Sequence, residues 1–187
     1  KAPLLLNEFE NTVGGPLSKK TSFLIDVTQH NVNNGAVVNA ITVDPSTFGT
    51  VPFSTSLENV QRRTRVYPRI DYQIDDKNTI AVRYSYLHGE VRSLGVGGFD
   101  LPSRAERATF NIQTLQLIET AVLSSQTVNE ARFQYYLNLF QGDPVDSGPA
   151  IQVLGSFSSG GNQMGQTRDH YRLFEIGDTP TRISGTH

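Results

Sequence analysis

Apolar and polar residues alternate along several stretches of this chain. The clearest alternation runs from Thr64 to Asp75, where every second residue from Val66 to Ile74 is apolar or aromatic. A second alternation covers residues 79–90, after the turn sequence Asp75-Asp76-Lys77-Asn78. A period of two indicates a strand with one apolar and one polar face. The two stretches therefore predict a β-hairpin.

Similar patterns predict five further strands. Alternation is strong in residues 128–141 and weaker near the C-terminus, and no segment has a helical period over 11 residues. The fold class we expect is all-β, built from antiparallel up-and-down strands. The predicted strands are about 4–13, 21–30, 64–74, 79–90, 107–123, 128–141 and 168–177.

Three local features of the sequence qualify this pattern. The composition of Gly14-Gly15-Pro16-Leu17 predicts a turn. Ile118 and Glu119 reverse the alternation of their strand, which predicts a β-bulge there. Pro68 cannot donate a backbone hydrogen bond, which favours an edge strand or a bulge.

The connections between the predicted strands alternate in length. Short ones lie at 14–20, 75–78 and 124–127, and long ones lie at 31–62, 91–105 and 142–167. Long structureless loops are uncommon in compact soluble domains. Outer-membrane barrels, in contrast, have short turns on one side of the membrane and long loops on the other. Residues 1–187 are therefore expected to form one partial transmembrane β-barrel domain with external loops at 31–62, 91–105 and 142–167.

The two faces of the predicted strands suit different surroundings. Tyr72, Tyr84, Tyr86 and Tyr135 are expected at the membrane interfaces. Charged side chains are costly in lipid and are expected to face the lumen. The candidate lumen-facing residues are Arg69, Asp71, Gln73, Arg83, Glu130, Arg132 and Gln134. A soluble β-sandwich, acting as a binding module or adhesin with one wet face, remains an open alternative.

Composition narrows the possible functions. The net charge of −2 and a pI near 6.1 argue against nucleic acid as a partner. The sequence contains no run of 18 apolar residues, so it predicts no membrane-spanning helix. The mean hydropathy of −0.32 does not separate a soluble protein from a barrel, because only every second residue of a barrel strand faces lipid.

Candidate chemistry is sparse. The four histidines have no metal-ligand spacing, and Gly95-Val96-Gly97-Gly98 lacks the dinucleotide-binding spacing. We therefore expect no catalytic residue, no metal and no cofactor, and we expect that the protein is not an enzyme. Arg62, Arg63 and Arg65 form a basic cluster at the expected outer rim, where contact with lipopolysaccharide is a hypothesis.

Several sequence motifs resemble the Oar-like TonB-dependent receptors, which have a carboxypeptidase-regulatory-like domain. The resemblance extends over residues 4–177. The motifs are Asn7-Glu8-Phe9, Gly14-Gly15-Pro16-Leu17, Arg69-Ile70-Asp71-Tyr72-Gln73, Asp76-Lys77-Asn78-Thr79, Arg83-Tyr84-Ser85-Tyr86, Gly95-Val96-Gly97-Gly98-Phe99, Leu115-Gln116-Leu117, Glu119-Thr120 and Asn129-Glu130-Ala131-Arg132-Phe133-Gln134-Tyr135.

This resemblance implies a segment of a transporter barrel in the bacterial outer membrane. Such a barrel has roughly 22 strands around a plug, and this chain supplies about seven of them. The implied partners are outer-membrane lipid and lipopolysaccharide, the rest of the barrel and its plug, and the TonB complex acting through the intact protein. The resemblance implies uptake of a nutrient, with the long loops as candidates for recognising it, and the nutrient itself stays unknown.

Overall fold

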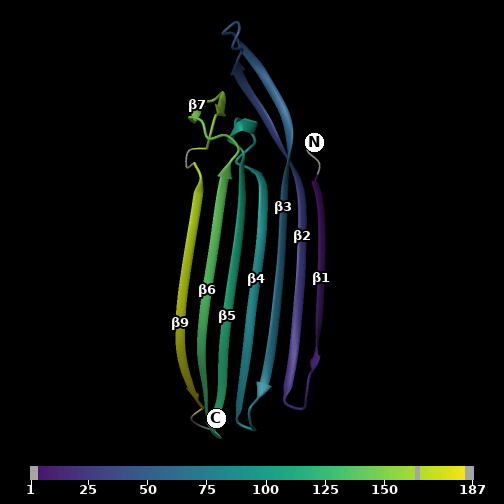
Figure 1. Ribbon diagram of the computed structural model, residues 1–187, viewed down its shortest axis with the longest axis vertical. Coiled ribbons are helices and arrows are strands. Elements are labelled where there is room, and N and C mark those ends of the chain that lie inside the picture. Colours follow the sequence, from purple (N-terminus) through teal and green to yellow (C-terminus); the bar gives the residue numbers. More distant parts are fainter. Residues whose placement is uncertain (1–3, 163–164, 184–187) are drawn as a thin grey trace.

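The computed structural model describes residues 4–162 and 165–183, which form one large antiparallel sheet with a small hairpin beside it. Seven strands follow one another across the large sheet in the order β1-β2-β3-β4-β5-β6-β9 (Figure 1). The elements are β1 (Leu4–Pro16), β2 (Thr21–Val43), β3 (Thr50–Gln73), β4 (Asn78–Leu94), the 3-10 turn η1 (Pro102–Arg104), β5 (Glu106–Ser124), β6 (Thr127–Pro144), β7 (Ile151–Val153), β8 (Phe157–Ser159) and β9 (Thr167–Arg182).

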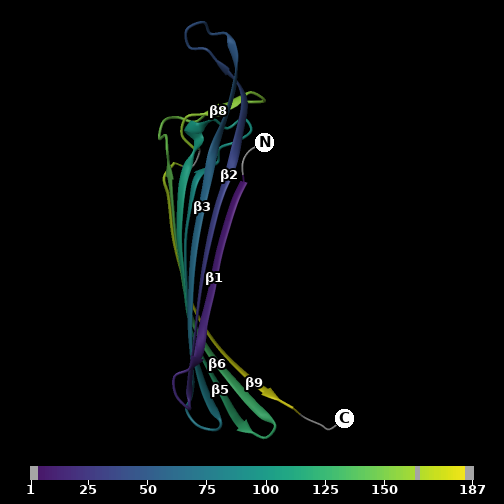
Figure 2. The same cartoon turned by 90° about the vertical axis from the view of Figure 1, so that its right-hand side faces the viewer.

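The large sheet is a single layer. Figure 2 shows it edge-on as a twisted, curved sheet, and each of its strands pairs antiparallel with its neighbours. The expected all-β, up-and-down architecture is therefore confirmed. No helix in the described part of the chain is long and apolar enough to cross a membrane.

The prediction of a long loop at residues 31–62 is wrong. β2 continues to Val43, β3 already begins at Thr50, and the two strands stay paired throughout this region. The resulting hairpin projects beyond the rest of the sheet (Figure 1). Its alternation is weak because the polar run around Asn33, Asn34 and Gly35 interrupts it.

The other two long connections contain the 3-10 turn η1 and the β7–β8 hairpin, and they contact the β2–β3 hairpin. The loop after β4 reaches β2, where the Asn39 N–H donates to the Gly98 carbonyl at 2.8 Å and the Gly98 N–H donates to the Val37 carbonyl at 2.9 Å. The loop after β6 contains the β7–β8 hairpin, and the Ile41 N–H donates to the Ser156 carbonyl at 3.2 Å. These contacts leave Val38 with no exposed surface. The loops thus gather at one end of the sheet.

The turn expected at Gly14-Gly15-Pro16-Leu17 lies slightly later, because β1 continues to Pro16 and pairs it with Ser22. Gly14 suits this pairing, since a Cβ there would lie 2.9 Å from the carbonyl oxygen of Phe23. The chain reverses over Leu17–Lys20, where the Leu17 N–H donates to the Thr21 carbonyl at 2.8 Å.

The predicted bulge at Ile118 and Glu119 is also wrong. Both residues keep an unbroken register with β4 and β6, and the shift in β5 comes later, between Val122 and Ser124. Pro68 lies in an inner strand and not at an edge or a bulge. Pairing of β3 with β4 lapses at Tyr67 and Pro68 and resumes at Arg69 in the same register, as expected where proline has no N–H to donate.

Candidate functional site

The register assigns every strand residue to one of two faces, because directly opposed residues on neighbouring strands point to the same side. One face, here called the apolar face, contains a lateral row of apolar side chains across six strands. The other is here called the polar face, and in the same part of the sheet it contains the charged residues Arg69, Asp71, Arg83, Glu130, Arg132 and Glu175. The apolar row is Phe23, Ile70, Val82, Leu117, Phe133 and Ile176.

The apolar face has tyrosines toward both ends of its apolar band. Tyr72 lies one row nearer the short turns than Ile70, while Tyr84 and Tyr86 lie nearer the loops. The hydroxyl of Tyr84 donates to the Gln113 side chain at 2.8 Å, and that of Tyr86 donates to the Asn111 side chain at 3.0 Å. Toward the loops the same face becomes polar. Its apolar band is therefore limited to the half of the sheet nearer the short turns.

All seven residues predicted to face the lumen lie together on the polar face. They occupy three successive rows at the short-turn end of the sheet. The rows join residues far apart in the sequence, and the row farthest from the short turns runs through Arg69, Arg83, Gln116 and Gln134. The middle row contains Asp71 and Arg132, and the row nearest the short turns contains Gln73 and Glu130.

The polar face is also the more crowded face. Every strand residue that the described structure buries lies on it, which is expected for the concave side of a curved sheet, where side chains converge. These residues are Thr28, Val38, Ala40, Ala81, Gly89, Ala108, Ile118 and Gly142.

Charges on the polar face are only partly paired. Arg69 holds Asp71 through both of its carboxylate oxygens, with Nη2 at 2.7 Å from Oδ1 and Nε at 2.8 Å from Oδ2. Arg132 lies 2.8 Å from Glu130. Arg83 sits directly opposite Arg69, and its buried Nε has no hydrogen-bond partner among the described residues. This end of the polar face therefore offers an uncompensated guanidinium.

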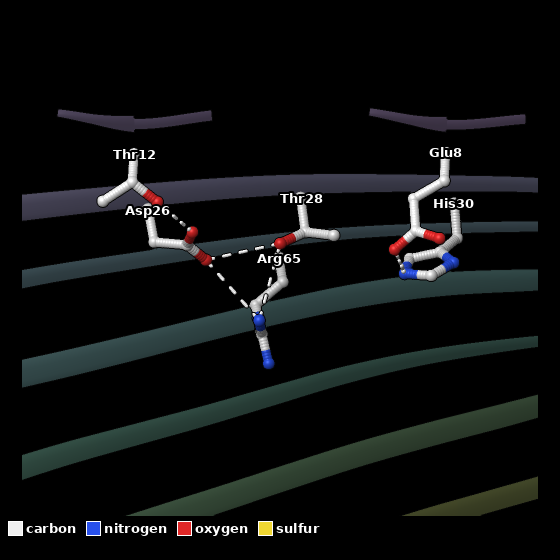
Figure 3. Close-up of polar contacts among 6 residues, drawn as sticks. All are labelled: Glu8, Thr12, Asp26, Thr28, His30 and Arg65. Carbon is white, nitrogen blue, oxygen red and sulfur yellow. Dashed lines mark hydrogen bonds and ion pairs between the residues drawn. The ribbon is translucent and has the colours of Figure 1, made fainter. Parts of the chain in front are cut away.

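A second polar group lies nearer the loops, on β1, β2 and β3 (Figure 3). Asp26 accepts hydrogen bonds from Thr12 at 2.9 Å and from Thr28 at 3.3 Å, and Arg65 approaches it at 3.5 Å. Sequence reasoning missed this group. The alternation places Asp26 on the polar side of its strand, but only the register brings Thr28 opposite Arg65.

Three further residues, Glu8, His30 and Arg63, extend this group along the strands. His30 lies 3.0 Å from Glu8 (Figure 3). Arg63 lies opposite His30 and makes no hydrogen bond or ion pair with the described residues. A small hollow of about 210 Å³ lies here, and its polar lining consists of Thr28, His30, Arg63 and Arg65.

The predicted basic cluster is divided between the two faces, so its interpretation as one surface is wrong. Arg62 lies on the apolar side opposite Glu90, whereas Arg63 and Arg65 lie on the polar face. The cluster is also not at the rim of a strand, because β3 begins at Thr50.

The described residues contain no group of three or more His, Asp or Glu side chains able to hold a metal ion. His30 contacts Glu8, His88 contacts Asn111 at 2.8 Å, and His170 accepts from Arg172 at 3.0 Å. His187 lies outside the described residues. The candidate site is therefore a polar surface formed by side chains of neighbouring strands.

A curved antiparallel sheet of long strands, with an apolar band on one side and charged rows on the other, defines the wall of a β-barrel. Residues 25–187 match the family described as "Outer membrane beta barrel domain". The chain belongs to this family, and its place is the outer membrane. No curated protein and no solved structure matches it.

Proposed function

We propose that this chain forms part of the barrel wall of a TonB-dependent outer-membrane transporter that takes up a nutrient. In this role the polar face lines the interior of the barrel and the apolar face contacts lipid. The single observation that carries the proposal is the gathering of all seven polar candidates into adjacent rows on the crowded side of the sheet.

The buried polar atoms that have no hydrogen-bond partner support this assignment of the faces. Three buried side-chain atoms have no hydrogen-bond partner among the described residues, and all three lie on the polar face: Asn59 Oδ1, Arg83 Nε and Asn138 Oδ1. Buried polar atoms require partners, and lipid chains supply none. The polar face is therefore suited to contact water or another protein segment.

Strand length supports an external position for the loops. The large-sheet strands contain 13 to 24 residues, whereas about 9 to 11 residues cross a membrane. The apolar band lies near the short turns, so the excess length projects on the loop side. The hairpin of β2 and β3 and the loops packed on it would then meet an incoming ligand first. The proposed role is passage of a solute, with no bond made or broken.

The soluble β-sandwich requires a second sheet packed on the apolar face. The described residues place no second sheet there, and the two-stranded sheet of β7 and β8 lies at the loop end. This alternative therefore has no support in the fold.

Single cysteines test the assignment of the faces. The chain has no cysteine of its own, so Gln116→Cys and Leu117→Cys give matched reporters on opposite faces of β5. In phospholipid vesicles, a fluorophore on the thiol of the Leu117→Cys variant should emit at shorter wavelength and be quenched by spin-labelled lipid. The same fluorophore on the Gln116→Cys variant should do neither. Equal quenching of the two labelled variants would contradict the proposal.

The TonB-dependent part of the proposal requires a plug inside the barrel, which follows from the family resemblance. Gln116→Cys in the full-length protein of intact cells should therefore react with a hydrophilic maleimide much more slowly than in the isolated chain in vesicles. Equal rates would indicate an open pore and would favour a porin-like role.

A further inference from the structure

The apolar face contains a hollow of about 530 Å³ at its short-turn end, between β5, β6 and β9. Its centre is Ala131, the smallest side chain in this part of the face. Glu119 and Asp178 lie directly opposite Ala131 on the two neighbouring strands. The surrounding apolar side chains are Ile80, Leu117, Phe133 and Ile176.

The two carboxylates break the pattern of this face. Glu119 is exposed and makes no hydrogen bond or ion pair with the described residues. Asp178 accepts one hydrogen bond, from Asn129 Nδ2 at 2.7 Å. Because the register through Glu119 is unbroken, this carboxylate belongs to the apolar face and is not displaced from the polar one.

The position of these carboxylates corresponds to a membrane interface. Tyr72 lies in the same row, opposite Ile80, which in turn lies opposite Glu119. Tyrosines mark the interface in outer-membrane barrels, and acidic residues on the lipid side are tolerated better there than at the midplane. The row that contains Glu119, Ala131 and Asp178 therefore meets lipid head groups, while Leu117 and Phe133 in the next row meet acyl chains.

We propose that this hollow binds a phospholipid with a primary ammonium head group, as in phosphatidylethanolamine. The ammonium lies between Glu119 and Asp178, which are separated by two strand spacings, about 10 Å. One acyl chain lies over Leu117, Phe133 and Ile176. The ammonium group can donate three hydrogen bonds to carboxylates, which a choline head group cannot do, and an anionic glycerol phosphate head group is repelled.

The proposal rests on the proposed function only in that the apolar face contacts lipid, and it is independent of transport. Native mass spectrometry of the whole chain in detergent micelles measures how strongly each lipid is retained. Phosphatidylethanolamine, phosphatidylcholine and phosphatidylglycerol with identical acyl chains are the probes.

Phosphatidylethanolamine should be retained about ten-fold more strongly than the other two lipids, which corresponds to roughly 1.4 kcal/mol. The double variant Glu119→Gln with Asp178→Asn should abolish this preference. Ala131→Leu fills the hollow and should weaken all three lipids together. Glu175→Gln, on the opposite face of β9, should leave the preference intact.

Equal retention of the three lipids by the unmodified chain would overturn the proposal, as would an unchanged preference in the double variant. The two amide substitutions conserve shape and remove charge only, so their effect does not depend on a change of fold. If the fluorophore of the labelled Leu117→Cys variant reports lipid while the three lipids are not distinguished, this inference alone fails. If that fluorophore reports water in vesicles, the proposed function fails first.

Discussion

At the scale of single residues, each paired arginine in the short-turn half of the polar face has one carboxylate partner: Asp71 for Arg69 and Glu130 for Arg132. Arg69 and Arg83 are direct cross-strand partners, and like charges in such a pair destabilise a sheet. Asp71 offsets this repulsion by binding Arg69 through both oxygens.

Asp71→Asn should therefore destabilise the folded chain by up to about 1 kcal/mol, a modest value because both side chains are about one-third exposed. Adding Arg69→Gln should recover part of this loss of stability, because it removes one of the two like charges that face each other, those of Arg69 and Arg83. Urea unfolding in detergent micelles measures the single variants Asp71→Asn and Arg69→Gln and the double variant. Strictly additive effects of the two substitutions would contradict the coupling.

Gly89 is a second position where adding one carbon atom should change the stability of the folded chain. It is buried opposite Phe110, and a Cβ at Gly89 would overlap the Phe110 ring. Gly89→Ala should displace this ring and cost about 1 to 3 kcal/mol. Gly15→Ala is the matched control, because no atom lies within 4 Å of a Cβ there. Equal unfolding midpoints for the two variants would show that the ring moves without penalty.

At the scale of elements, the short turn between β3 and β4 is organised by one carboxylate. Asp75 accepts hydrogen bonds from the Lys77 N–H at 2.8 Å and the Asn78 N–H at 2.9 Å, and also from the Asn78 side chain. The Asn78 side chain is the main cause that holds the pKa of Asp75 below its usual value of 3.8, followed by the Lys77 N–H.

A folded-state pKa below the unfolded one contributes stability above the unfolded pKa, and that contribution disappears as pH falls through the folded value. The unmodified chain should therefore unfold at higher urea concentration than Asp75→Asn at pH 7, and this difference should begin to fall below about pH 4 and disappear once the pH is below the folded-state pKa. Asp76→Asn, in the same turn and without a hydrogen bond in the described structure, is the matched control and should leave the unfolding midpoint at pH 7 unchanged. A difference as large at about pH 2.5 as at pH 7 would contradict the assignment.

The elements also show how far the sequence predicts the fold. Alternation located the parts of the strands in and near the apolar band, such as Val66 to Ile74, because there one face is apolar and the other polar. It failed for residues 31–62, where both faces of the β2–β3 hairpin meet water or polar loops. Backbone pairing continues in that hairpin without any need for alternation.

The candidate site shows the same limit. Alternation alone placed Arg69, Asp71 and Gln73 on one side of their strand, and the register confirms it. The register determines which residues of different strands become neighbours. The contact between Asp26 and Arg65 could therefore not be predicted from the sequence. Glu119 was noticed as an exception to the pattern, and its explanation as a bulge was wrong.

At the scale of the whole molecule, the seven strands do not close on themselves. The described outer edges of β1 and β9 pair with no other strand. Unpaired edges of this length, together with an uncovered apolar face, favour association between chains in water. Lipid or detergent covers the apolar face but leaves the edges open. The folded chain is therefore expected to need further strands for a closed wall.

One pair of substitutions tests this dependence on lipid. Leu115→Lys places a charge inside the apolar band, in the row between those of Leu117 and Tyr86, and lysine costs up to about 2 to 4 kcal/mol within the lipid-facing band of outer-membrane barrels. Gln116→Lys places the same charge one residue along, on the polar face, where repulsion from Arg83 on the neighbouring strand should cost only about 0.2 to 1 kcal/mol. Refolding into phospholipid vesicles, followed by heat-modifiable gel migration, should give much less folded Leu115→Lys than folded Gln116→Lys. Equal yields, or cooperative folding of the unmodified chain as a monomer in plain buffer, would show that the apolar face is buried by protein and not by lipid.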